Sequence, residues 1–319
     1  MKKTGQNKRF ETKKILVALC ALVVSMTAGA FGAKAQTKTQ AQETQVQTAA
    51  QTQNAGVASN TIIDISAKYD NYVGKTFSIC GDSISTFEGY TYTDLNYYPK
   101  DTDVDIPLKT WWGQMSGMTG MKLLSDSSVG GSTVCGNPDD PEGKCFTSDL
   151  RLTRLMNLEG EKPDVIFVEG GVNDMAQNRV LVPDTFQQAV INLNDPEGPE
   201  NIIVFSDAYD LLLTKISKMY PDAEIICLTC ETIATFDNAD RTSWYEPKNG
   251  FGATVEDFNQ IIKAVAAYHG VRVIDTHECG ITQENVGLLM QEDGLHPNAT
   301  GCMMIGQYVA GHMNNSSAY

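Results

Sequence analysis

Apolar, β-branched runs alternate with helical patterns from about Lys75 to the end of the chain. The run Val165–Glu169 is almost continuously apolar, which is typical of a strand buried on both faces of a parallel sheet. In residues 205–220 the apolar positions recur with the spacing of one helix face. This alternation predicts a parallel sheet with helices on both faces. The expected strands are 75–80, 122–125, 165–169, 223–230 and 271–275, and the expected helices are 110–118, 205–220, 255–268 and 298–313.

The first 60 residues have a different pattern. Basic residues precede an apolar stretch from Ile15 to about Ala30, and a small-x-small site follows at Ala33 and Ala35. Residues 1–35 therefore predict a secretory signal peptide, with an uncleaved N-terminal anchor as the alternative. Residues 36–60 are rich in Gln, Thr and Ala and predict a disordered linker. Residues 61–319 are long enough for one α/β domain, which we expect to be secreted or extracellular, with cell-surface association as an option.

Composition narrows the partners that this domain can have. The chain carries 39 acidic and 24 basic residues, a net charge of −15. An acidic surface repels nucleic acid and anionic membranes, so we expect no nucleic-acid partner. The apolar leader is shorter than the roughly 20 residues of a spanning helix, so we expect no integral membrane segment. A neutral or cationic small molecule or polymer fits this charge better.

Seven of the eight cysteines follow the predicted leader. An odd number leaves at least one thiol free or linked to another chain. Cys135 and Cys145 flank a turn-rich loop, and export would permit a disulfide between them, with free thiols as an equal alternative. Cys227 and Cys230 form a C-x-x-C pattern inside an apolar run, which favours buried small side chains over a metal or redox pair.

Two motifs carry a candidate nucleophile and a candidate base. Ser83 ends the tripeptide Gly-Asp-Ser after the first expected strand, and His296 lies three residues after Asp293. A serine hydroxyl needs a histidine to take its proton and usually a carboxylate to orient that histidine. Taken alone, Gly-Asp-Ser is more often a turn with a helix cap, and the segment from Asp293 to Pro297 also fits the start of a helix. Of the four histidines, His269 at a helix end and His277 at a strand end are rival bases.

Two further motifs carry hydrogen-bond donors. Gly131 lies in a Gly-Gly loop after the second expected strand, and its backbone N–H can approach a ligand closely because glycine has no Cβ. Asn173 follows the strand 165–169, and its amide could bind a developing oxyanion. Alone, each is a common loop or turn residue. Because the carboxyl ends of parallel strands share one edge of a sheet, we expect these motifs to meet there.

Taken together and in this order, the four motifs resemble those of the SGNH (GDSL-type) hydrolase superfamily, over about residues 75–312. The resemblance implies a flavodoxin-like three-layer α/β/α sandwich with a mainly parallel five-stranded sheet. It implies Ser83 as the nucleophile, His296 as the base and Asp293 as the third member of a triad. It also implies that Gly131 and Asn173 donate to the oxyanion, together with the backbone N–H of Ser83.

One position departs from the family pattern. Asp126 stands where the second motif often begins with Asn, which leaves both Gly130 and Gly131 open as the donor. The spacing to Ser132 and Thr133 favours Gly131. The implied reaction is hydrolysis of a carboxylic ester through an acyl-enzyme, with no metal or organic cofactor.

Aromatic residues between the first two motifs bear on the substrate. Tyr and Trp side chains stack well on sugar rings, although they could equally belong to the core. A secreted, acidic esterase of this kind fits removal of short acyl groups, such as acetyl, from a small-molecule or polysaccharide ester. The alternatives are a lipase, phospholipase or thioesterase of the same superfamily, and a non-catalytic binding domain. The aromatic residues are Phe87, Tyr90, Tyr92, Tyr97, Tyr98, Trp111 and Trp112.

Overall fold

The computed structural model describes residues 69, 71–92, 100–184 and 201–314. The predicted signal peptide (1–35) and linker (36–60) lie outside the described residues, as do Tyr97 and Tyr98. Within the described part of the chain, no helix combines the length and the apolar character that crossing a membrane requires.

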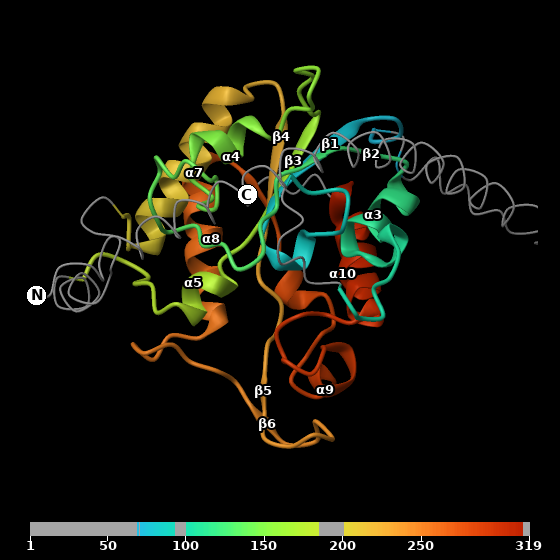
Figure 1. Ribbon diagram of the computed structural model, residues 1–319, viewed down its shortest axis with the longest axis vertical. Helices are drawn as coiled ribbons and strands as arrows, with labels where there is room; N and C mark the ends of the chain where they lie inside the picture. The colour runs from blue at the N-terminus through green and yellow to red at the C-terminus, as the bar shows by residue number, and fades with distance from the viewer. Residues whose placement is uncertain (1–68, 70, 93–99, 185–200, 315–319) are drawn as a thin grey trace, which may run out of the picture. The chain divides into compact units, whose positions relative to one another are not determined.

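A five-stranded, all-parallel sheet forms the centre of the fold, in the order β2-β1-β3-β4-β7 (Figure 1). The central strand β3 is buried along its whole length, which explains its continuously apolar sequence. Phe77 pairs with Val165 and Gly81 with Glu169, so the carboxyl ends of β1 and β3 are level. The strands are β1 (Thr76–Gly81), β2 (Lys122–Asp126), β3 (Val165–Glu169), β4 (Glu224–Leu228) and β7 (Arg272–Ile274).

Helices cover both faces of this sheet. α7 (Phe205–Met219) and α8 (Val255–His269) pack together on one face, and α3 (Trp111–Thr119) and α10 (Ala299–Met313) pack together on the other (Figure 1). The predicted fold class, a parallel five-stranded sheet between helical layers, is therefore confirmed. Short helices occupy the connections: α4 (Asp149–Thr153), α5 (Val172–Ala176), α9 (Val286–Leu289), and the 3₁₀ turns η1 (Ser83–Ser85), η2 (Pro107–Lys109) and η3 (Thr276–Glu278).

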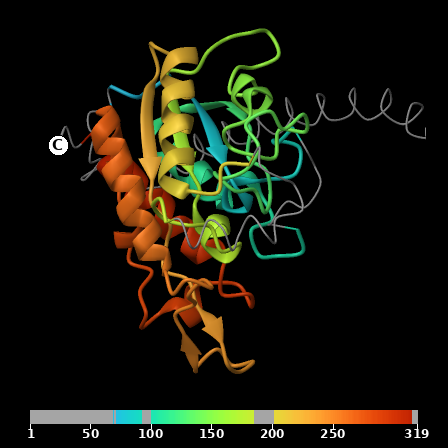
Figure 2. The ribbon, with the colours of Figure 1, turned by 90° about the vertical axis from the view of Figure 1, so that its left-hand side faces the viewer.

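A two-stranded antiparallel hairpin lies outside the main sheet. It pairs β5 (Thr235–Phe236) with β6 (Trp244–Tyr245). Figure 2 shows this hairpin, in orange, extending past the edge at which the parallel strands end. The backbone N–H of Ala234 donates to the carbonyl of Gly294 at 2.9 Å, so the base of the hairpin contacts the loop that precedes α10.

The ends of the long helices follow from their caps. The hydroxyl of Thr110 accepts the N–H of Gly113 at the start of α3, and the side chain of Asn298 accepts two N–H groups at the start of α10. α8 begins with a reciprocal capping box between Thr254 and Asp257. Such caps satisfy N–H groups that have no partner within the helix.

The aromatic residues of α3 belong to the core. Trp111 and Trp112 are buried, and both indole N–H groups donate to Ser85, at 3.0 Å to its hydroxyl and 2.9 Å to its carbonyl. Tyr90 packs against Trp112, and Phe87 packs edge-on to Tyr90. For Trp111 and Trp112 the core alternative therefore holds over an exposed sugar-binding surface.

All seven cysteines in the described residues are free and buried. The disulfide between Cys135 and Cys145, one of two alternatives from the sequence, is therefore absent from the structure. Burial raises the pKa of both thiols, so each stays protonated and packs as a small side chain. Cys227 and Cys230 are buried, as the apolar sequence around them predicts.

Candidate active site

Ser83 begins the 3₁₀ turn η1, directly after β1 ends. The side chain of Asp82 caps this turn, because its Oδ1 atom accepts the N–H of Ile84 at 3.0 Å. The Thr86 hydroxyl donates to the Ser83 carbonyl at 2.8 Å at the other end of the turn. The serine is thereby held at the carboxyl edge of the sheet.

Two buried side chains, those of Arg151 and Glu169, support this turn. The Arg151 guanidinium donates to the Gly81 carbonyl and lies 3.9 Å from the ring centroid of Phe146. Glu169, at the end of β3, accepts the N–H of Asp82 at 3.3 Å and the hydroxyl of Ser85 at 2.9 Å. Sequence reasoning assigned Arg151 and Glu169 no role. A visible signal existed for Glu169, which is the one acidic residue of the strand Val165–Glu169.

Ser83, His296 and Asp293 form a continuous hydrogen-bonded chain. The Nε2 atom of His296 lies 2.7 Å from the Ser83 hydroxyl, and its Nδ1 atom lies 2.6 Å from Oδ2 of Asp293. Partial burial raises the pKa of the Asp293 carboxyl, but hydrogen bonds from His296 and from the Leu295 N–H outweigh it and hold that pKa below its ordinary value. An ionised Asp293 keeps the proton on Nδ1, which leaves Nε2 free to accept the serine proton.

The rival histidines have other partners. His269 ends α8, and its Nε2 atom lies 2.8 Å from a carboxylate oxygen of Asp210. Nδ1 of His277 lies 3.1 Å from the Cys230 carbonyl. Among the described contacts, neither ring is hydrogen-bonded to Ser83.

Gly131 occupies the third position of a turn, which the Ser132 N–H closes by donating to the Val129 carbonyl at 3.2 Å. Its φ of +73° is a conformation that glycine adopts without strain. The N–H of Val129 donates to the Gly81 carbonyl at 3.1 Å, so this turn lies beside η1. Within the described residues, the N–H groups of Ser83 and Gly131 donate to no protein acceptor.

Asn173 lies in the first turn of α5 and is buried. Its Nδ2 atom donates to Oδ2 of Asp82 at 3.1 Å, which fixes the amide and leaves its second N–H for a ligand. Asp82 is fully buried, and that burial raises its pKa to about 6. At neutral pH the carboxyl is still largely ionised, so it remains a strong acceptor for the amide.

Asp174, the residue after Asn173, connects two loops of the site. Its carboxylate oxygens accept the N–H groups of Val134 and Cys135, each at 2.9 Å. Burial raises the pKa of Asp174 to about 6. These bonds join the start of α5 to the chain that follows the Gly131 turn.

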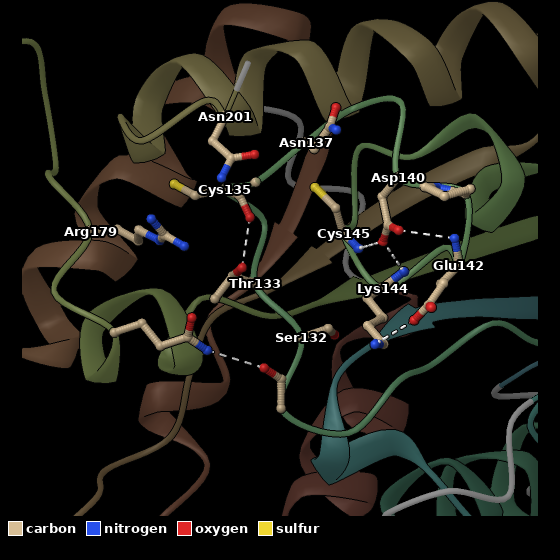
Figure 3. A pocket seen from close by; sticks show the side chains of 14 residues that line it. Ser132, Thr133, Cys135, Asn137, Asp140, Glu142, Lys144, Cys145, Arg179 and Asn201 are labelled. Atoms are coloured by element: carbon tan, nitrogen blue, oxygen red, sulfur yellow. Dashed lines mark hydrogen bonds and ion pairs between the residues drawn. The ribbon is translucent and has the colours of Figure 1, made fainter. Parts of the chain in front are cut away.

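A cavity of about 740 Å³ opens beside Gly131 (Figure 3). Its wall comes from the segment that follows the Gly131 turn, from the end of α5 and from Asn201. The lining residues are Gly131, Ser132, Thr133, Cys135, Gly136, Asn137, Asp140, Pro141, Glu142, Lys144, Cys145, Gln177, Arg179 and Asn201. Within the described residues, no group of His, Cys, Asp and Glu side chains is arranged to hold a metal ion.

Similarity to known proteins agrees with this geometry. The family model of GDSL-like lipases and acylhydrolases matches residues 75–244. No curated protein is similar enough in sequence to match the chain.

Three solved structures are among those similar to this one. One is described as a GDSL-like lipase from Bacteroides uniformis, with 24% identity over 76% of this chain and 96% of that chain and a TM-score of 0.50. A protein from Lactobacillus plantarum has 19% identity, a TM-score of 0.53 and coverage of 76% and 98%. A carbohydrate acetylesterase from Sinorhizobium meliloti has 16% identity, a TM-score of 0.48 and coverage of 76% and 99%, too distant to bear on the substrate.

The first two likenesses support the fold, and the family match spans more than half of the chain, from the start of the first strand to the hairpin. The chain belongs to the GDSL-like lipase and acylhydrolase family, a family of serine ester hydrolases.

Proposed function

We propose that Ser83, His296 and Asp293 are the catalytic triad of this esterase. The observation that carries the proposal is the unbroken hydrogen-bonded chain from the Asp293 carboxylate through the imidazole to the Ser83 hydroxyl. The backbone N–H groups of Ser83 and Gly131 and the side-chain amide of Asn173 are the proposed donors to the oxyanion.

In the proposed reaction, Ser83 Oγ attacks the ester carbonyl while His296 Nε2 takes the hydroxyl proton. The carbonyl oxygen becomes an oxyanion, which the three donors stabilise. His296 then gives its proton to the departing alcohol, and an acyl-enzyme ester remains on Ser83. A water molecule, deprotonated by His296, attacks this ester and releases the acid. Preorganised donors of this type are each worth about 10²–10³ in rate.

We further propose that the substrate is a short-acyl ester of a carbohydrate. Support comes from the polar lining of the cavity beside Gly131, which suits a hydroxyl-rich molecule better than a hydrocarbon chain. The competing function is a lipase, phospholipase or thioesterase with a long acyl chain. The preferred acyl length separates the two.

The test uses the purified enzyme, a fluorophosphonate probe and p-nitrophenyl esters of increasing acyl length. We expect the probe to label Ser83, the Ser83→Ala variant to lose the label and at least about 10³-fold in kcat, and the acetyl ester to be preferred. Ser206→Ala, which removes a hydroxyl on α7 that contacts Asp207, is the control and should match the parent. A parental rate in Ser83→Ala would refute the nucleophile, and a preference for long chains would favour the lipase.

A further inference from the structure

The cavity beside Gly131 lies against the proposed oxyanion site. Gly131 contributes both to the cavity wall and, through its N–H, to the proposed oxyanion hole. Gln177 lines the same cavity, and its Nε2 atom donates to the Gly131 carbonyl at 3.2 Å. Gly131 is thus shared by the cavity wall and the proposed oxyanion hole, so the cavity adjoins the position that an ester carbonyl would occupy.

We infer that this cavity is the subsite for the alcohol part of the ester, and that the alcohol is a neutral, polyhydroxyl molecule of sugar type. The inference rests on the proposed function. It adds where the alcohol part binds and which chemical groups recognise it.

The size and polarity of the cavity decide which substituent enters. About 740 Å³ is within the usual range of small-molecule sites and is far more than a short acyl group needs. Hydroxyl, amide and charged side chains provide most of the wall, as Figure 3 shows. A hydrocarbon chain would displace water from these polar groups without replacing its hydrogen bonds, which is unfavourable. A hydroxyl-rich alcohol would instead satisfy them.

The charges in the wall point to a neutral ligand. Asp140 and Glu142 are balanced by Lys144 and Arg179. The Asp140 carboxylate already accepts the N–H groups of Glu142, Lys144 and Cys145 at 2.9, 2.5 and 3.1 Å. The Lys144 ammonium lies 2.5 Å from a Glu142 carboxylate oxygen. No single sign of charge is therefore left to attract an ion.

Two side-chain amides in the cavity wall can form hydrogen bonds with the hydroxyl groups of a ligand. Asn137 accepts the Asp139 N–H with its Oδ1 atom at 2.9 Å, and its Nδ2 atom has no hydrogen bond to any described residue. Gln177 donates from Nε2 to Gly131, and its Oε1 atom likewise has no partner among the described residues. The spare donor of Asn137 and the spare acceptor of Gln177 can each bind a hydroxyl, because a hydroxyl both accepts and donates.

The test compares kcat/KM for acetylated xylo-oligosaccharides with kcat/KM for p-nitrophenyl acetate in Asn137→Leu and Gln177→Leu. Each variant should lower the ratio of the two values about three- to tenfold, mainly through KM for the oligosaccharide. Gln307→Leu, an exposed change on α10, is the matched control and should leave both values unchanged. Asn137→Leu is the cleaner variant because Asn137, unlike Gln177, has no hydrogen bond to Gly131 among the described residues.

Several results would overturn the inference. Equal losses on both substrates would show that the amides act on the structure of the site alone. An unchanged ratio would show that the alcohol part does not bind in the cavity. Better hydrolysis of long-chain esters by Asn137→Leu would show that the acyl group binds there instead. These outcomes differ from failure of the proposed function, in which the parent enzyme hydrolyses neither substrate or Ser83→Ala retains the rate.

Discussion

At the residue scale, the turn that carries Ser83 (η1) depends on a buried carboxyl whose pKa is raised. Burial raises the pKa of Glu169 well above its ordinary value, and the nearby carboxyls of Asp82 and Glu231 raise it further. The raised pKa favours the neutral form of Glu169, which still accepts hydrogen bonds from Ser85 and from the Asp82 N–H. Because two adjacent buried carboxylates repel each other, a neutral Glu169 lets Asp82 remain ionised and hold Asn173.

This arrangement predicts different results for two substitutions of Glu169. Glu169→Gln keeps the acceptor and the neutral charge, so kcat/KM should stay within about threefold and the free energy of unfolding within about 1 kcal/mol. Glu169→Ala leaves the Asp82 N–H and the Ser85 hydroxyl without this acceptor, and should lower the free energy of unfolding by about 1–3 kcal/mol. Urea denaturation and ester kinetics measure both. If Glu169→Gln is as damaging as Glu169→Ala, Glu169 is ionised in the native enzyme.

At the element scale, the loop that carries His296 is held by segments from distant parts of the chain. Asp103 accepts the N–H of Ala299 at the start of α10 and the side-chain amide of Gln291. The N–H of Gln291 donates to the His296 carbonyl at 2.7 Å. Gly294, inside this loop, has a φ of +68° and packs closely against the base of the hairpin. The position of the imidazole thus depends on packing between elements.

Gly294→Ala tests this dependence. The new Cβ would lie 2.0 Å from the Ala234 carbonyl oxygen, so the loop must shift. We expect kcat to fall at least about tenfold, since a displacement of about 1 Å from the reactive geometry can cost 10²-fold. Gly89→Ala is the control, because Gly89 has a similar φ of +79° but open space around its Cβ position. If both variants lose the same activity, backbone strain and not the contact with Ala234 is responsible.

At the scale of the whole molecule, five fully or almost fully buried carboxyls couple folding to pH. Burial raises the pKa of Asp82 and Asp174 to about 6, of Asp126 to about 7 and of Glu231 to about 8, and raises that of Glu169 well above its ordinary value. In the unfolded chain these groups release their protons near pH 4. The folded state therefore binds more protons between about pH 4 and pH 8, and stability falls as pH rises through that interval.

Thermal unfolding at several pH values should show this coupling, with a higher Tm at pH 5 than at pH 8. Asp126→Asn removes one of the carboxyls that couple folding to pH. It should raise the free energy of unfolding at pH 8 and have little effect on it at pH 5. The upper limit of the increase is about 1.4 kcal/mol for each unit by which the pKa is raised. Asp222→Asn, a change at an exposed residue, is the control for a general change in charge. A Tm that rises from pH 5 to pH 8 in the parent protein would contradict the assignment of raised pKa values.

Much of the fold follows from local sequence pattern. Each main strand and long helix lies where its apolar spacing predicts it, with ends that differ by at most one or two residues, because apolar spacing does not define where an element ends. The continuous apolar run at 165–169 also predicts that β3 is buried on both faces. The predicted secretion and the linker stay predictions, because residues 1–60 lie outside the described chain.

The site itself could be predicted only in part. The motifs around Ser83, Gly131, Asn173 and His296 follow strands or precede the last helix, and strand ends share one edge of a parallel sheet. Pattern alone could not choose His296 over His277. That choice depends on a contact between Ser83 and His296 that spans 213 positions of the chain.

By itself, the sequence determined the order of strands and helices and the chemical groups at the strand ends, because periodicity and motif order are local properties of a chain. Only the tertiary structure decided which histidine reaches Ser83, that Trp111 and Trp112 are core, that Cys135 and Cys145 are free, and that buried Glu169 supports the turn that carries Ser83. These features arise from packing between segments far apart in sequence, where burial and hydrogen bonding together set the position and charge of each side chain.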